Sequence, residues 1–190
     1  MSVLTLRPNA DSAVEFSPSV TTDHYTLLDE ATLDEADYIY NAVTGFASTK
    51  TEILGFPNHS TESGTINSVT VKCKAKYILV GSSSVNATIA PCVTISSTVY
   101  TSATQNLTDS VAEYSYAWET NPATSSAWSW TEIDDLLGGI RGAQGFTGKN
   151  NCRKVYVYQL WVEVDYTAGG GGATLPLKNV FNRPFRGVFR

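Results

Sequence analysis

Apolar and polar residues alternate with a period of two along several stretches of this chain, most clearly in residues 155–166. One side of that run is apolar and consists of Leu160, Val162, Val164 and Tyr166. The opposite side consists of Trp161, Glu163 and Asp165. A period of two is the side-chain pattern of a β-strand with one buried face and one solvated face. We therefore predict that a strand over residues 155–166 closes the globular body.

A second alternating run lies at residues 65–79. Its apolar side consists of Val69, Val71, Cys73, Ala75 and Tyr77. Its polar side consists of Thr70, Lys72, Lys74 and Lys76. Antiparallel sheets with one solvated face show this pattern. The lysine row could serve as a binding stripe, but a solvated sheet face or a lysine-guarded sheet edge is the preferred interpretation.

The remaining pattern predicts several shorter strands and one helix. Ser129 and Glu132 fit a capping box, in which a hydroxyl and a carboxylate satisfy the free amides of the first helical turn. The spacing of Ile133, Leu136 and Leu137 then gives one apolar helix face, and we expect a short helix near residues 130–138. Residues 9–37 are interpreted as a solvated acidic loop and 141–150 as a glycine-rich loop. The fold class that follows is all-β: an antiparallel, jelly-roll-like β-sandwich.

The composition agrees with a β-rich chain and divides it into two unequal parts. Charged residues make up 16% of the sequence, below the ~25% typical of soluble domains. Residues 1–167 hold 9 Lys and Arg against 18 Asp and Glu, a balance of −9, whereas residues 168–190 hold 4 basic residues and no acid. An acidic body is a poor surface for phosphate backbones, so we expect no nucleic-acid binding by the body.

The basic segment defines the domain organisation. We expect a sandwich domain at 1–167, followed at 168–190 by a glycine linker and a C-terminal arm. Pro184 and Gly187 would break a helix, so an extended arm is expected. The candidate partner-binding residues of the arm are large apolar and basic, as in interface anchors: Leu175, Leu177, Phe181, Arg183, Phe185, Arg186, Phe189 and Arg190. Docking onto another subunit is the preferred interpretation; a membrane-surface anchor, a nucleic-acid contact and an inert tail remain alternatives.

The sequence offers few residues that could form a catalytic or metal-binding site. The three cysteines Cys73, Cys92 and Cys152 form no C-x-x-C pair, which favours reduced structural thiols over a disulfide framework or a zinc site. His24 and His59 lie in polar stretches without a recognisable nucleophile beside them. We therefore expect no enzyme activity, no metal and no cofactor. No apolar run is long enough for a membrane span, and no membrane partner is expected.

Several motifs occur in an order that resembles a known family. They are Leu-x-Leu-Arg-Pro-Asn at 4–9, Trp-Glu-Thr-Asn-Pro-Ala-Thr at 118–124, Trp-Ser-Trp-Thr at 128–131, Ile-Asp-Asp-Leu-Leu-Gly-Gly-Ile at 133–140 and Trp-Val-Glu-Val-Asp-Tyr at 161–166. The chain resembles small β-sandwich structural proteins of tailed bacteriophages over roughly residues 3–167. The resemblance implies a virion protein made in the host cytoplasm, of the capsid-decorating, fibre or tail-associated type. It also implies partners among other virion proteins and copies of itself, and carries over no catalytic residues.

A carbohydrate-binding or adhesin module is the alternative hypothesis. Sugar rings stack on exposed aromatic faces, and Trp118 and Trp161 are the candidate platforms. A core or interface role is the commoner use of tryptophan and competes with this interpretation.

Overall fold

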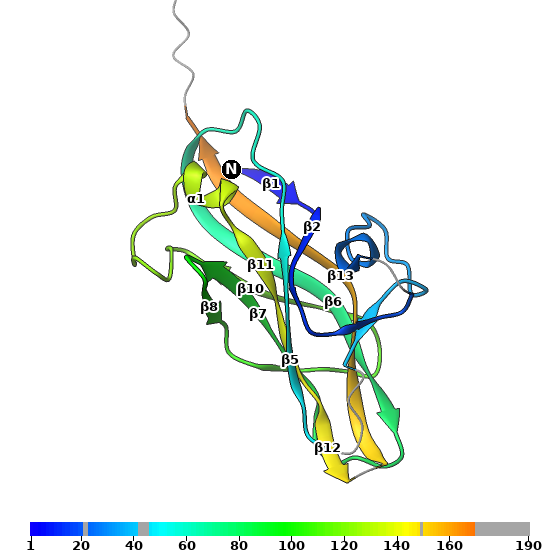
Figure 1. Ribbon diagram of the computed structural model, residues 1–190. Coiled ribbons are helices and arrows are strands. Elements are labelled where there is room, and N and C mark those ends of the chain that lie inside the picture. The colour runs from blue at the N-terminus through cyan, green and yellow to red at the C-terminus, as the bar shows by residue number, and fades with distance from the viewer. Residues whose placement is uncertain (21–22, 42–45, 149, 170–190) are drawn as a thin grey trace, which may run out of the picture.

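The computed structural model describes residues 1–20, 23–41, 46–148 and 150–169, which form two antiparallel sheets packed face to face (Figure 1). Sheet A has the order β10 (Ala112–Trp118), β6 (Gly64–Val80), β13 (Asn151–Ala168), β4 (Ile39–Tyr40) and β3 (Ser17–Pro18); β1 (Ser2–Leu6) and β12 (Gly145–Gly148) also pair with β13. Sheet B has the order β2 (Ala10–Val14), β5 (Thr49–Gly55), β11 (Leu137–Ala143), β7 (Thr88–Ile95) and β8 (Thr98–Thr101), and β9 (Gln105–Asn106) also pairs with β7. The expected all-β sandwich is confirmed.

The longer strands alternate between the two sheets along the chain. β5 lies in sheet B, β6 in sheet A, β7 in sheet B, β10 in sheet A, β11 in sheet B and β13 in sheet A. Such crossings make a sandwich jelly-roll-like, because each layer is built from strands that are distant in sequence. The apolar residues of both inner faces therefore meet in one core, which holds Leu54, Val71, Val93, Ile140 and Leu160 among others.

β13 is the central strand of sheet A, and it contains a bulge. It pairs with β6 from Cys152↔Val80 to Ala168↔Gly64, with a register shift between Val157 and Gln159. Val155 and Val157 are core residues before the shift, and Leu160, Val162 and Val164 are core residues after it. An extra residue in one strand reverses the parity of the buried positions, so both halves of β13 face the core. The alternation expected for 160–166 is confirmed from Val162 to Asp165, but Trp161, expected on the solvated face, is buried.

The expected helix is present but shorter than its apolar face suggested. α1 spans Trp130–Asp134 and has the capping box of Ser129 and Glu132 in full. Leu137 and Gly138 belong instead to β11. Gly139 lies within this strand, and a Cβ at this position would lie 1.8 Å from the carbonyl oxygen of Glu52 on β5. Close strand approach, rather than the end of a helix, requires this glycine.

Two stretches interpreted as loops contain strands. Residues 141–150 contribute to β11 and to β12, which turn into β13. Residues 9–37 contain β2, β3 and the 3₁₀ helix η1 (His24–Leu27). The loop interpretations were wrong at the strands, because glycine and acidic residues are common in loops but here their backbones complete sheet ladders. The acidic segment also allowed a helical turn near residues 26–35, and η1 overlaps that range at its start.

Candidate functional site

The predicted partner-binding arm lies outside the described residues, except for the point where the chain enters it. β13 ends at Ala168, and the N–H of Gly169 donates to the carbonyl oxygen of Ser63 at 3.1 Å. Gly64 has a φ of +112°, and a Cβ there would lie 2.2 Å from backbone atoms of residues 167 and 169. The chain therefore leaves the body through a backbone contact that only glycine at position 64 permits.

Aromatic side chains support this end of β13. The Trp130 indole N–H donates to the carbonyl oxygen of Gly64 at 3.0 Å, and its ring packs edge-on against Tyr166 at a centroid distance of 5.1 Å. His59 packs on the other side at 4.9 Å, and its Nδ1 lies 2.7 Å from Asp134 Oδ1. The hydrogen bond from His59 lowers the pKa of Asp134. In Figure 1, α1 and the end of β13 lie at the same end of the sandwich as the N-terminus.

The two candidate sugar platforms are packed into the body. Trp118 is 8% exposed and belongs to the core, next to Tyr116 and Trp128. Trp161 is 7% exposed, its indole N–H donates to Glu163, and the Arg7 guanidinium lies 5.7 Å from the ring centroid. Stacking of a sugar needs an open ring face. Neither ring offers one in this structure.

A groove on the outer face of sheet B arises where β7 contains a proline. In an antiparallel strand the N–H and C=O of one residue point to the same side. The carbonyl oxygen of Pro91 accepts from the N–H of Ser102 at 3.0 Å, so its missing N–H faces the same neighbour. β8 accordingly ends at Thr101 and pairing resumes only at Gln105 in β9. The segment 102–104 is thus released from the ladder and forms a wall beside β7.

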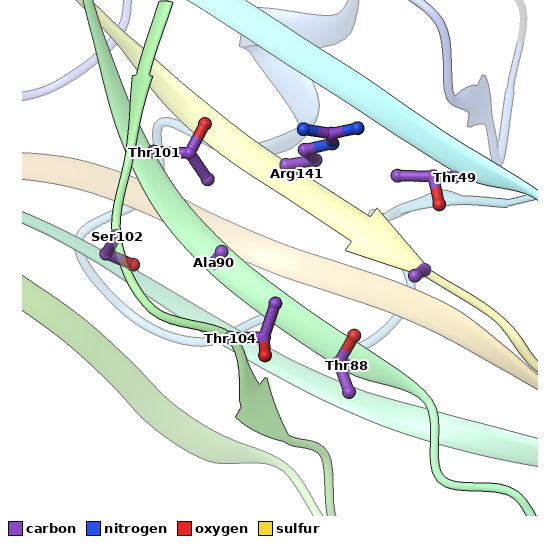
Figure 2. Close-up of a pocket in the computed structure, with 8 residues that line it drawn as sticks. Thr49, Thr88, Ala90, Thr101, Ser102, Thr104 and Arg141 are labelled. Carbon is purple, nitrogen blue, oxygen red and sulfur yellow. The ribbon is translucent and has the colours of Figure 1, made fainter.

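The groove has a volume of about 380 Å³ and is lined by residues of four segments. The lining residues are Thr49, Thr88, Ala90, Thr101, Ser102, Thr104, Arg141 and Ala143. Figure 2 shows the Arg141 side chain between those of Thr101 and Thr49, with Ala90, Thr104 and Thr88 below it in this view. Arg141 pairs with Ala90 on β7, so on that side the neighbouring side chain in the sheet is a methyl group.

Two of the three lysines on the outer face of sheet A, Lys72 and Lys76, are engaged in ion pairs. Lys72 Nζ lies 2.9 Å from Glu163 Oε2 and 3.5 Å from Glu113 Oε1, and the hydrogen bond to Glu163 raises the pKa of Lys72. Lys76 Nζ lies 2.6 Å from Glu35 and 5.1 Å from the centroid of the Tyr158 ring. Lys74 forms no ion pair among the described residues. The row therefore lies on an outer sheet face that is charge-paired in part, and not on a sheet edge, because β6 lies between β10 and β13.

A buried pair joins the acidic N-terminal segment to sheet B. His24 Nδ1 lies 2.6 Å from Glu52 Oε1, and Glu52 Oε2 accepts from the backbone N–H groups of Glu15 and Phe16 at 3.1 and 3.2 Å. Burial raises the pKa of Glu52 to about 7, although these contacts oppose the shift. Glu52 is fully buried and His24 is 7% exposed. The pair therefore ties two elements together out of reach of a substrate in solution.

The three thiols are free and buried. Burial raises the pKa of Cys73 strongly and that of Cys92 to about 12, while the charge of Arg141 lowers the latter pKa. Both thiols stay protonated at neutral pH. Across the described ranges, no group of three or more His, Cys, Asp or Glu side chains is placed to hold a metal ion. The described helices are all too short or too polar to cross a membrane.

Comparisons of this sequence with protein-family models and with curated proteins find no match.

The groove is the candidate site that reasoning from sequence missed. Its residues come from positions 49, 88–90, 101–104 and 141–143, and no spacing rule joins such distant segments. One local signal was available. A proline within the apolar stretch 88–95 indicates an interrupted ladder, and Arg141 follows a run of small and apolar residues.

Proposed function

We propose that this chain is a non-enzymatic structural protein of a bacteriophage virion, a capsid-decorating or other head or tail accessory protein. It assembles through contacts with other subunits that include its C-terminal arm. The all-β sandwich and the ordered motifs of the sequence support the proposal.

The observation that carries the proposal is the change of charge and composition where β13 ends. The chain up to residue 167 has a balance of −9, and the 23 residues after it have four basic residues, three phenylalanines and no acid. Opposite charges on two parts of one chain favour association between copies or with another acidic subunit. Phenylalanine and arginine are both enriched in protein–protein interfaces relative to the rest of the surface.

The exit of the chain from the body suits this role. Gly169 is hydrogen-bonded to Ser63, and Trp130 holds both Gly64 and Tyr166. The body thereby presents residues 170–190 from a fixed point. A fixed starting point reduces the conformational entropy that docking removes.

Removal of residues 170–190 is expected to leave the sandwich folded and to abolish both self-association and incorporation into particles. Circular dichroism and urea unfolding check the fold. Sedimentation velocity checks self-association, which is expected to weaken as ionic strength rises because opposite charges drive it. Mass spectrometry of purified particles checks incorporation.

A full-length variant with Phe181, Phe185 and Phe189 replaced by Ser is the matched control. It keeps the four basic residues and therefore separates apolar anchoring from charge. Normal incorporation of the truncated chain would contradict the role of the arm. Absence of the full-length chain from purified particles would contradict the virion assignment itself.

A further inference from the structure

The groove on sheet B is polar and carries one unpaired cation. Its lining contains five hydroxyl side chains, one guanidinium and two alanines, and neither an acidic nor an aromatic residue. Every ion pair found among the described residues uses other cations, so Arg141 has no carboxylate partner within the part of the chain that the structure describes. Lys50, Lys74 and Lys154 likewise form no ion pair in the described ranges, and Arg141 differs from them in that it lines this groove.

The position of Arg141 favours a ligand over a role in folding. It lies on β11, the middle strand of sheet B, where its flanking positions on the same face are Gly139 and Ala143. Its partners across the sheet are Thr51 and Ala90. Small neighbours leave the planar guanidinium with its hydrogen-bond donors free for a bidentate contact with an anion.

The size and the hydroxyl groups narrow the ligand class. A volume of about 380 Å³ exceeds what a bare phosphate or carboxylate would fill and matches the lower range of small-molecule sites. Threonine and serine hydroxyls both donate and accept, so they suit a ligand that is rich in hydroxyl groups. The absence of acidic side chains from the lining disfavours a cation, and the absence of aromatic rings disfavours a neutral sugar held by stacking.

We propose that this groove binds an acidic sugar residue, a hexuronate unit of a glycan. Arg141 holds the carboxylate, and the hydroxyls of Thr49, Thr88 and the 101–104 wall hold the ring hydroxyls. The site lies on sheet B rather than sheet A, and its described lining residues all belong to the sandwich domain. A chain that assembles into a larger particle would thereby also carry a receptor for acidic glycans.

Titration of the isotope-labelled full chain with methyl β-glucuronide, followed by NMR, tests the proposal. Methyl β-glucoside is the matched ligand, because it differs only at the C6 carboxylate. We expect the glucuronide to shift the amide signals of residues 88–90, 101–104 and 141–143, and the glucoside to bind at least about tenfold more weakly, as expected for loss of a charged hydrogen bond. Shifts of equal size with both ligands, or shifts confined to sheet A, would overturn the proposal.

Two variants and one further ligand sharpen the test. Arg141→Gln is expected to weaken glucuronide binding by tenfold or more, whereas Lys74→Gln removes the same charge from sheet A and is expected to leave binding unchanged. Thr88→Val keeps the shape of the side chain and removes its hydroxyl, and it is expected to weaken binding by a few-fold. Acetate is expected to bind much more weakly than the glucuronide; equal affinity would overturn the assignment to a sugar.

Discussion

The outer faces of the two sheets differ in how the cations Lys72, Lys76 and Arg141 are paired, although Lys74 on sheet A also forms no ion pair in the described ranges. On sheet A, Lys72 lies between Glu163 and Glu113, and Lys76 contacts Glu35. On sheet B, Arg141 lies among hydroxyls and alanines without an ion pair to any carboxylate in the described ranges. Charges that form ion pairs with one another have few hydrogen bonds left for a ligand, whereas a cation without an ion pair can bind an anionic ligand from solution. The two faces therefore differ in how these three cations are satisfied, although both are built from strands of the same sandwich.

Gly139→Ala is expected to have the largest effect, because it disrupts the sheet that carries the groove. The added Cβ would lie 1.8 Å from the carbonyl oxygen of Glu52, and the clash forces β5 and β11 apart. We expect a loss of roughly 3 kcal/mol of unfolding free energy, measured by urea denaturation. Gly148→Ala is the control, since its Cβ would meet nothing closer than Asn151 Nδ2 at 3.8 Å. Equal losses in both variants would show that close strand approach is not the reason for Gly139.

The stability contributions of one carboxyl in each sheet are expected to depend on pH in opposite directions. Burial raises the pKa of Glu52, on β5 of sheet B, from 4.5 to about 7. A carboxyl with a higher pKa in the folded chain binds its proton more tightly there, so its contribution to stability is full below about pH 4.5 and is lost as the pH rises through about 7. Relative to Glu52→Gln, the wild-type free energy of unfolding is expected to fall between pH 4.5 and 8, by on the order of 3 kcal/mol, because a pKa difference of one corresponds to about 1.4 kcal/mol.

Glu163 on sheet A provides the matched control for this pH dependence. Its pKa is lowered in spite of burial, because Lys72 and Trp161 donate hydrogen bonds to it. Its contribution to stability is therefore present above its ordinary pKa and is lost as the pH falls, the reverse of Glu52. Wild type and Glu163→Gln are expected to differ by a constant amount between pH 6 and 8. Parallel curves for wild type and Glu52→Gln over pH 4.5–8 would contradict the proposed state of Glu52.

Removal of the two cations should give the smallest effects and compare the faces directly. Lys72→Met breaks two contacts to carboxylates and is expected to cost about 0.5–1 kcal/mol, because the pair is partly exposed. Arg141→Met breaks no ion pair and is expected to change the unfolding free energy by less than about 0.5 kcal/mol. Urea denaturation at low and at high salt measures both, and high salt should reduce the difference. A larger cost for Arg141→Met would assign Arg141 to folding.

Periodicity predicted the strands whose burial alternates over many residues. β6 and the second half of β13 were found because each has a face that is buried throughout, such as Val69, Val71 and Cys73. The bulge near Tyr158 is visible in the sequence as a change of parity: the apolar positions fall on odd numbers up to Val157 and on even numbers from Leu160. Alternation within either half alone does not reveal it. β2 was missed for a different reason: all of its residues are exposed, so no apolar pattern marks it.

The site was harder to predict than the fold, because it depends on which strands become neighbours. The groove needs Arg141 beside Ala90, and this register follows from pairing of β11 with β7 across about fifty residues of sequence. Capping boxes and alternation are local, and nothing local in the sequence specifies that contact. The exposure of Trp118 and Trp161 likewise depends on tertiary packing. The alternative hypothesis of a sugar platform needs an exposed ring, but packing covers both rings.

The long ladder between β6 and β13 has a mechanical consequence. Hydrogen bonds between antiparallel strands are perpendicular to the strands. A partner that holds residues beyond Gly169 and pulls along β13 therefore loads the ladder from Ala168↔Gly64 to Cys152↔Val80 in shear, together with the pairs between β13 and β1. Bonds loaded in shear must break together, whereas bonds at the end of a peeled strand break one at a time. Tension from this end of the chain is thus shared across the full length of sheet A.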